Sequence, residues 1–220
     1  STKLIYLLTN KTESYYSFKK IPKKDGTKRI IAIPSYTLKI TQRWILKNIL
    51  NKIRPSDYAM AFRKSSNNNK FDIKKNAYYH SDSLYGLSID LSDFFPSINA
   101  AKVYRILKGI GYNNTASAIL TNLCTLENKL PQGAVCSPAL SNLICMRLDR
   151  RLFGLCSKRG VLYTRYADDM YFSCDNKGLL LKMFPIIEKI IKSEGFIINQ
   201  DKLHYHTPKN KHLITGVVIS

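Results

Sequence analysis

Acidic residues are scarce in this chain. Among its 220 residues, 15 are Asp or Glu and 35 are Lys or Arg, so the formal net charge is +20. So large a basic excess on a folded chain favours a polyanionic partner, which can be a nucleic acid or an anionic membrane surface. No basic amphipathic helix dominates the sequence, so a nucleic acid is the favoured partner and no membrane is expected.

Long apolar runs and paired cysteines are also missing. No segment approaches the roughly 20 consecutive apolar residues of a membrane-spanning helix, and the N-terminal stretch lacks the apolar core of a signal peptide. The five cysteines are odd in number and form no C-x-x-C pair, which argues against a disulfide framework or a zinc site. We therefore expect a cytoplasmic protein, with enough hydrophobic residues for one large domain or two small ones.

The few acidic residues are clustered. Residues 81–100 contain three Asp and no basic residue, and residues 161–175 contain three Asp against one Arg. Carboxylates gathered in a protein that binds polyphosphate repel that ligand unless a cation lies between them. A divalent metal is the usual solution.

The spacing of apolar residues and the positions of Gly and Pro predict an α+β chain, in which helices alternate with antiparallel hairpins. Strands are expected in a hairpin over 19–35 and at 85–91, 161–166, 170–174, 196–198 and 213–219. Helices are expected at 37–54, 99–109, 115–126, 137–155 and 179–193, and a polar loop at 63–75.

Three carboxylates fall where expected strands end or turn. Asp90 closes one strand, and Asp168 and Asp169 lie at the tip of a hairpin. If these strands are neighbours in one sheet, the carboxylates come together, and one or two Mg²⁺ ions are the expected occupants. Two metals about 4 Å apart would activate a nucleophilic oxygen and stabilise the leaving oxygen of a phosphoryl displacement. An Asp-Asp pair is also ordinary turn chemistry, so the pair alone decides nothing.

Three segments resemble the motifs of reverse transcriptases, in the order and spacing of that family. LYTRYADDMYFS at 162–173 resembles the catalytic hairpin, SIDLSDFFPSI at 88–98 resembles the first catalytic-aspartate motif, and LPQGAVCSPALSNLI at 130–144 resembles the segment between them. NAYYH at 76–80 and ITG at 214–216 resemble the N-A-x-x-H and V-T-G motifs of bacterial retron reverse transcriptases.

The resemblance implies the fingers and palm of a right-hand polymerase, with a palm built as a ferredoxin-like antiparallel sheet backed by helices. Residues 1–84 would be mostly fingers, with part of 101–128 packed beside them, and residues 85–220 would be mostly palm. The thumb is expected after residue 220.

The implied activity is that of a retron RNA-directed DNA polymerase, which adds dNTPs to a hydroxyl primer on a structured non-coding RNA. The product would be msDNA, a branched RNA–DNA hybrid, made for phage defence with a separate effector protein. Two alternatives stay open: another bacterial reverse transcriptase, of the group II intron or non-retron defence type, and a non-catalytic RNA-binding scaffold. The cognate RNA, the effector and the oligomeric state are also open.

By the same resemblance, the catalytic residues are Asp90, Asp168 and Asp169. They would bind two Mg²⁺ ions, for which Mn²⁺ can substitute, with the carbonyl of Leu91 as a further ligand.

Other residues are matched to nucleotide contacts. Phe95 would be the steric gate against ribonucleotides, with Phe94 in its place if the register is shifted by one; both can also be core aromatics. Gln132 would contact the incoming nucleotide, or else be a solvated turn residue. Arg29, with Lys23 or Lys24, would clamp the triphosphate, although a basic run can also be merely solvated.

The remaining matches concern RNA. Asn76 and His80 of the N-A-x-x-H segment would contact the cognate RNA or have a purely structural role, and Thr215 and Gly216 belong to the second retron segment. Asn199 and Lys202 fit the N-x-x-K element beside the palm, although Leu203 stands where the family has Thr.

Overall fold

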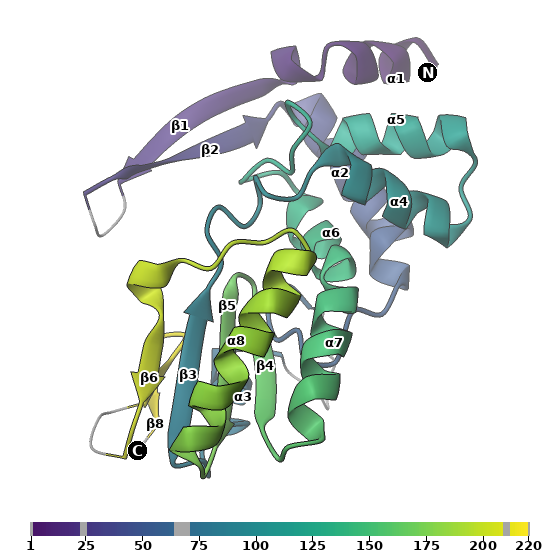
Figure 1. Cartoon of the computed structure of the whole chain (residues 1–220). Coiled ribbons are helices and arrows are strands. Elements are labelled where there is room, and N and C mark those ends of the chain that lie inside the picture. The colour runs from purple at the N-terminus through teal and green to yellow at the C-terminus, as the bar shows by residue number, and fades with distance from the viewer. Residues whose placement is uncertain (1, 23–25, 64–70, 209–211, 220) are drawn as a thin grey trace. The chain divides into compact units, whose positions relative to one another are not determined.

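The structure is a computed structural model that describes residues 2–22, 26–63, 71–208 and 212–219 (Figure 1). The chain divides into two compact units: unit 1 comprises residues 1–54 and 95–144, and unit 2 comprises residues 55–94 and 145–220. In this division residues 55–84 group with unit 2. The expected limits of fingers and palm remain a prediction.

Unit 1 is mainly helical and carries one long hairpin. Its strands are β1 (Tyr16–Pro22) and β2 (Lys28–Pro34), which pair antiparallel in the predicted place. Its helices are α1 (Thr2–Asn10), η1 (Thr12–Tyr15), α2 (Tyr36–Asn48), η2 (Leu50–Lys52), α4 (Ala100–Ile110), α5 (Asn114–Cys124) and α6 (Ser137–Ile144).

A buried glutamine ties the parts of unit 1 together. Gln42 on α2 has no exposed surface, and its amide nitrogen donates to the hydroxyl of Tyr16 at 2.9 Å and to the carbonyl of Leu123 at 2.8 Å. Its amide oxygen accepts from the backbone N–H of Val135 at 3.1 Å. A buried amide must satisfy these groups internally, so Gln42 fixes the contacts of α2 with the hairpin and α5.

Unit 2 is built on a four-stranded antiparallel sheet in the order β4-β5-β3-β6. Its elements are α3 (Ile73–Tyr78), β3 (Tyr85–Asp90), α7 (Met146–Ser157), β4 (Leu162–Tyr166), β5 (Asp169–Cys174), α8 (Lys177–Ser193), η3 (Gln200–Lys202), β6 (His204–His206), β7 (His212–Ile214) and β8 (Val217–Ile219). Helices separate β3 from β4 and β5 from β6, so the strand order is that of the ferredoxin-like fold. The predicted palm architecture is confirmed.

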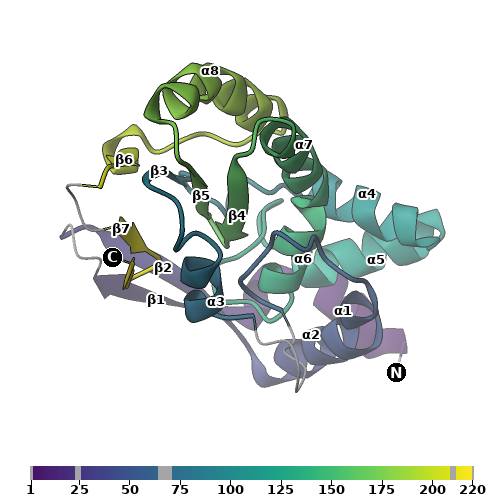
Figure 2. The same cartoon turned by 90° about the horizontal axis from the view of Figure 1, so that it is seen from below.

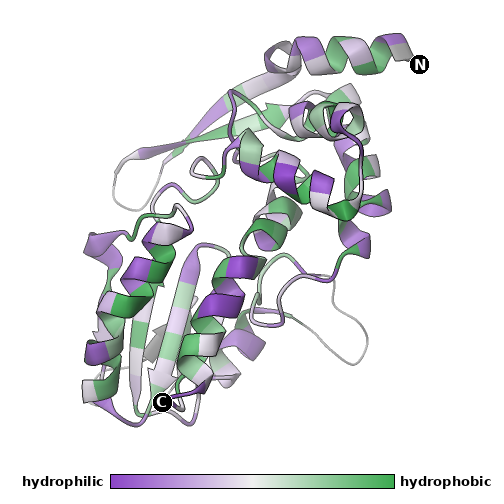
Figure 3. Cartoon of the chain, turned by 45° about the vertical axis from the view of Figure 1, so that its right-hand side comes forward, coloured by the Kyte–Doolittle hydropathy of each residue, from purple (hydrophilic) through white to green (hydrophobic). Residues whose placement is uncertain are grey.

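Each face of this sheet is covered differently (Figure 2). Helices α7 and α8 pack on one face, where the buried side chains Leu148 and Leu152 of α7 and Met183 and Ile187 of α8 recur at helical spacing. Figure 3 shows hydrophobic (green) and hydrophilic (purple) residues alternating along the helices beside the sheet. On the other face, α3 contacts β4 and the β7–β8 hairpin, and Ile214 packs with Ala77 and Tyr171.

Several expected boundaries are wrong. The helix expected at 137–155 is two helices, α6 and α7, broken at Cys145, and the strand expected at 196–198 is a single bridge between Leu91 and Ile198. The expected loop at 63–75 contains the start of α3, and its residues 64–70 lie outside the described part. The expected strand at 213–219 is a hairpin, whereas α1 and β6 were not predicted. No helix within the described ranges is long and apolar enough to cross a membrane.

Candidate active site

The strand register of unit 2 brings the predicted catalytic residues together. Asp90 is the last residue of β3, Asp169 is the first of β5, and the two are direct partners across the sheet. The β4–β5 hairpin closes with the pair Tyr166–Asp169, so Ala167 and Asp168 form its two-residue loop. The N–H of Leu91 donates to the carbonyl of Asp168 at 3.1 Å, which joins this loop to the end of β3.

The loop itself is strained. Ala167 has a φ of +60°, in the left-handed region that favours glycine. A positive φ at the first central residue is the geometry of a type II′ hairpin turn, whose twist matches the flanking strands. This conformation costs a non-glycine residue about 1–3 kcal/mol, so the surroundings must hold it.

Two side chains from the segment after α8 contact Asp90, which is 7% exposed. The Lys202 ammonium lies 3.0 Å from its Oδ1, and the Asn199 side-chain amide donates to the same oxygen at 3.2 Å. The N–H of Asn199 also donates to the Asp90 carbonyl at 2.8 Å. Both residues of the predicted N-x-x-K element therefore orient Asp90.

Asp169 lies in a crowded field of negative charge. Its pKa is raised to about 7, first because the surrounding protein displaces water, then because Asp168 and Asp90 carry like charge. Lys202 offsets part of this effect, and a hydrogen bond to Asp90 favours the protonated form. The residue is nevertheless exposed, so solvent screens the charge and a ligand can reach it.

A cavity of about 220 Å³ opens beside these carboxylates. Asp90, Asp169 and Lys202 line it, together with Asn76 of α3 and the Thr215–Gly216 turn between β7 and β8. Asn76 is 1% exposed, its Nδ2 donates to the Thr215 hydroxyl at 3.4 Å, and its Oδ1 is buried without a hydrogen-bond partner. Residues of the two retron-like segments, 76–80 and 214–216, thus meet beside the carboxylates. The segments are far apart in the sequence, so no local sequence pattern could predict this contact.

His80 lies in the core of unit 2. Its side chain has no exposed surface, and its ring nitrogens lie 2.7 Å from the Ser173 hydroxyl and 2.8 Å from that of Thr164. Burial lowers its pKa to about 3, so the ring is neutral. These contacts support the structural role considered for His80, and its contact with RNA stays a prediction.

The predicted nucleotide contacts are distributed between the units. Phe94, in unit 2, is 3% exposed and stacks on Phe196 with ring centroids 5.8 Å apart, which supports its alternative role as a core aromatic. Phe95 is half-buried and belongs to unit 1, and its gate role stays a prediction.

Gln132 and Arg29 belong to unit 1. The Gln132 carbonyl accepts from the N–H of Ala32 at 2.8 Å, and a Cβ on Gly133 would lie 2.7 Å from the Ala32 carbonyl oxygen, so this turn packs closely on β2. Arg29 is exposed on β2, while Lys23 and Lys24 lie outside the described residues. The roles of all four stay predictions.

Sequence reasoning missed a buried ion pair beside the catalytic hairpin. Arg165 of β4 and Asp149 of α7 both have no exposed side chain, and Arg165 Nε and Nη2 each donate to one Asp149 oxygen at 2.8 Å. Burial opposes the charge on Arg165, but Asp149 outweighs it and keeps the pKa of Arg165 above its usual value. A charged residue inside an otherwise buried strand was the available signal.

The donor chemistry of the site fits a divalent cation. Carboxylate oxygens are the ligands that Mg²⁺ prefers, and the pKa of Asp169 is raised first by burial and then by the like charges of Asp168 and Asp90, which a cation would offset. No group of three or more His, Cys, Asp or Glu side chains in the described ranges is arranged to hold a metal ion. Asp90 and Asp169 thus provide a carboxylate pair, beside which Asp168 adds charge.

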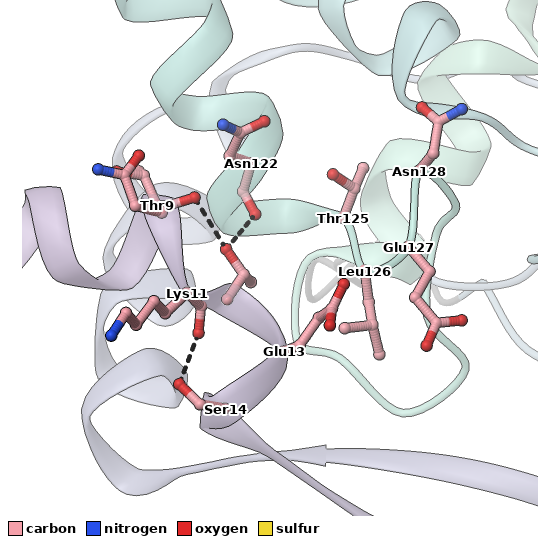
Figure 4. A pocket seen from close by; sticks show the side chains of 11 residues that line it. Thr9, Lys11, Glu13, Ser14, Asn122, Thr125, Leu126, Glu127 and Asn128 are labelled. Atoms are coloured by element: carbon pink, nitrogen blue, oxygen red, sulfur yellow. Dashed lines mark hydrogen bonds between the residues drawn. The ribbon is translucent and has the colours of Figure 1, made fainter.

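A larger hollow, of about 530 Å³, lies in unit 1 (Figure 4). Its lining consists of residues 9–14, residue 122 and residues 125–128. The Thr12 hydroxyl donates to the Leu8 carbonyl at 2.7 Å. None of the predicted site residues lines it. We therefore do not assign the active site to this hollow, although it is larger than the cavity beside the carboxylates.

Comparison with known proteins decides the family. The family model described as reverse transcriptase (RNA-dependent DNA polymerase) matches residues 21–219. The Escherichia coli retron Ec86 reverse transcriptase is 40% identical over 222 residues, covering 100% of this chain and 68% of the relative. The chain is a retron-type member of the reverse transcriptase family. The Myxococcus xanthus retron Mx65 reverse transcriptase is 33% identical over 218 residues, covering 91% of this chain and 50% of the relative.

Solved structures support the fold of this reverse transcriptase. Apo telomerase from Candida tropicalis superposes with a TM-score of 0.64 at 16% identity, over 92% of this chain and 46% of that chain. The predicted right-hand polymerase fold, with fingers and palm, is confirmed. The chain spans about half to two thirds of the length of the curated relatives named above.

Proposed function

We propose that this chain is the catalytic part of a retron RNA-directed DNA polymerase. It adds dNTPs, directed by RNA, to a hydroxyl within a structured non-coding RNA and produces msDNA. The observation that carries the proposal is the direct pairing of Asp90 with Asp169 beside the Asp168 loop, in a chain of the reverse transcriptase family.

In this proposal Asp90, Asp168 and Asp169 would hold two Mg²⁺ ions. When bound, the ions would lower the pKa of the attacking hydroxyl and stabilise the charge that develops on the phosphate. Asn199 and Lys202 keep Asp90 oriented, and Lys202 balances part of the negative charge of the site. No side chain needs to act as a general base.

Three residues of unit 1 carry the remaining proposed nucleotide contacts. Arg29 is suited to the triphosphate because its planar guanidinium can form two parallel hydrogen bonds with phosphate. Phe95 excludes a ribose 2′-hydroxyl, and Gln132 contacts the incoming nucleotide. In unit 2, the carbonyl of Leu91 would be a further metal ligand.

Asn76, Lys202, Thr215 and Gly216 line the cavity beside the carboxylates, which supports a contact of these residues with the RNA. The net charge of +20 favours such a partner. The biological setting that we propose is cytoplasmic phage defence with a separate effector protein.

The proposal is tested with a retron RNA and no added primer. We expect wild-type protein with Mg²⁺ to extend that RNA into DNA that stays attached through a 2′–5′ branch, so that debranching enzyme releases it. EDTA and the Asp169→Asn variant should each abolish synthesis. RNA binding without synthesis by the wild type, unaffected by Mg²⁺, would favour the scaffold alternative. Synthesis only from an added primer would favour another class of reverse transcriptase.

A further inference from the structure

The buried pair of Arg165 and Asp149 contacts the catalytic hairpin directly. Besides its two bonds to Asp149, Arg165 donates from Nη1 to the carbonyl of Ala167 at 3.1 Å. Ala167 is the strained residue of the loop, and Asp168 and Asp169 follow it. One guanidinium therefore connects α7 to the turn that presents two of the three carboxylates.

The backbone of Arg165 is held as firmly as its side chain. Its N–H donates to the carbonyl of Tyr58 at 2.8 Å, and its carbonyl accepts from the N–H of Met60 at 2.7 Å. These backbone bonds and the two bonds to Asp149 hold the guanidinium where Nη1 donates to the Ala167 carbonyl. The planar fork of arginine allows this division of donors, which the point charge of lysine does not.

An ion pair is a costly way to fill a protein interior. Replacing a buried ion pair with apolar residues of similar volume often leaves the stability of a protein unchanged or increases it. Packing alone therefore does not explain the charges at positions 149 and 165. An apolar pair cannot donate to the Ala167 carbonyl. The bond to the loop needs the arginine, and the arginine in turn needs a buried carboxylate.

We propose that Arg165 and Asp149 are positioning residues of the polymerase site, which hold the Ala167–Asp168 loop in the geometry that its carboxylates need. The inference rests on the proposed function, because the carboxylates are those assigned to catalysis. Neither residue touches substrate. Both act through the carbonyl of Ala167, and from there through the Asp168 carbonyl, which accepts from Leu91.

The test removes both charges together with the one hydroxyl that donates to Asp149, so that the Ala167 carbonyl loses its bond to Arg165. The Tyr163 hydroxyl donates to Asp149 at 2.8 Å, so the variant combines Asp149→Leu, Arg165→Met and Tyr163→Phe. The matched control is Tyr163→Phe alone, which leaves both bonds of Arg165 to Asp149 in place. Circular dichroism and thermal melting show whether each protein folds.

The proposal predicts a folded triple variant with impaired chemistry. Its kcat for dNTP addition should fall by about 10- to 100-fold, the usual effect of misplacing catalytic groups. Its KM for dNTP should stay within about twofold of the control, because ground-state binding is untouched. A merely structural role would change melting and leave kcat of the folded protein unaltered.

A second readout does not depend on activity. Hydrogen exchange of the Leu91 amide reports whether the loop stays docked on β3, because this N–H donates to the Asp168 carbonyl. We expect exchange about tenfold faster or more in the triple variant, since local opening becomes easier. If the wild type shows no polymerase activity, the proposed function fails, and this readout still decides the positioning role.

A folded triple variant with control-like kcat and control-like Leu91 exchange would overturn the proposal. If the triple variant does not fold, Arg165→Lys replaces it in both measurements. Lysine keeps the charge beside Asp149 but cannot also donate to Ala167. Unchanged kcat and unchanged exchange in that variant would overturn the proposal in the same way.

Discussion

Burial shifts the pKa values of Asp169 and His80 in opposite directions. The pKa of Asp169 is raised to about 7, because water is displaced around it and two other carboxylates are close. Burial lowers the pKa of His80 to about 3, and the ring is held by two hydroxyls in the sheet. Sequence alone singled out both residues, but it could not tell that one lies at the cavity and the other in the core.

The raised pKa of Asp169 predicts that metal binding releases a proton. Below about pH 7 the metal-free carboxyl is protonated, so a divalent cation must displace that proton, and metal affinity should fall as the pH is lowered. Calorimetric titration with Mn²⁺ in buffers of different ionisation enthalpy counts the protons. We expect close to one proton released at about pH 6 and almost none at about pH 8.5. A proton count independent of pH would contradict the assignment.

For His80, the lowered pKa predicts that acid destabilises the protein. The unfolded residue titrates near 6.5 and the folded one at about 3, so the stability that this group contributes is complete above pH 6.5 and is lost as the pH falls toward 3. In that window the free energy of unfolding should fall by about 1.4 kcal/mol for each pH unit of acidification. Thermal melting between pH 4 and 7.5 measures it, and His80→Gln, which does not titrate, should lack this slope. Equal slopes in the two proteins would refute the buried neutral ring.

At the scale of elements, the strands and helices with strong patterns were predictable and the breaks between them were not. The β3 strand and the β4–β5 hairpin follow from alternation and a turn, as does the hairpin in unit 1. The break at Cys145 interrupts an apolar pattern that runs on unchanged, so periodicity could not reveal it. Helix α1 exposes Leu4, Ile5, Tyr6 and Leu7, and β6 has three residues, so neither gives a clear pattern.

Packing within the sheet of unit 2 predicts a strict need for glycine at one position of β3. A Cβ on Gly86 would lie 2.1 Å from the Tyr171 hydroxyl. Gly86→Ala should therefore destabilise the protein by about 1–3 kcal/mol, as measured by denaturant unfolding. Gly154→Ala in α7 is the control, because its Cβ would meet nothing within 4 Å. This substitution should raise the free energy of unfolding by about 0.5–1 kcal/mol. Equal stability of Gly86→Ala and wild type would show that Tyr171 is not fixed there.

On the scale of the whole molecule, the family and the fold were predictable and the spatial site only partly so. The motif order identifies a reverse transcriptase, and the basic charge favours a nucleic acid as partner. The meeting of Asn76 with Thr215 at the carboxylates and the buried pair of Arg165 with Asp149 depend on contacts between distant segments. Such contacts follow from strand order and helix packing, which a single sequence does not specify.

The most direct test of the central claim is single-turnover addition of one dNTP to a primed RNA template. Wild type, Asp169→Asn and Asp175→Asn are compared with Mg²⁺ and with EDTA; Asp175 lies just past the far end of β5 and accepts from the Leu84 N–H at 3.0 Å. We predict Mg²⁺-dependent addition by wild type and Asp175→Asn, and loss of addition in Asp169→Asn although it still binds the RNA. Addition by Asp169→Asn at the wild-type rate would contradict the account.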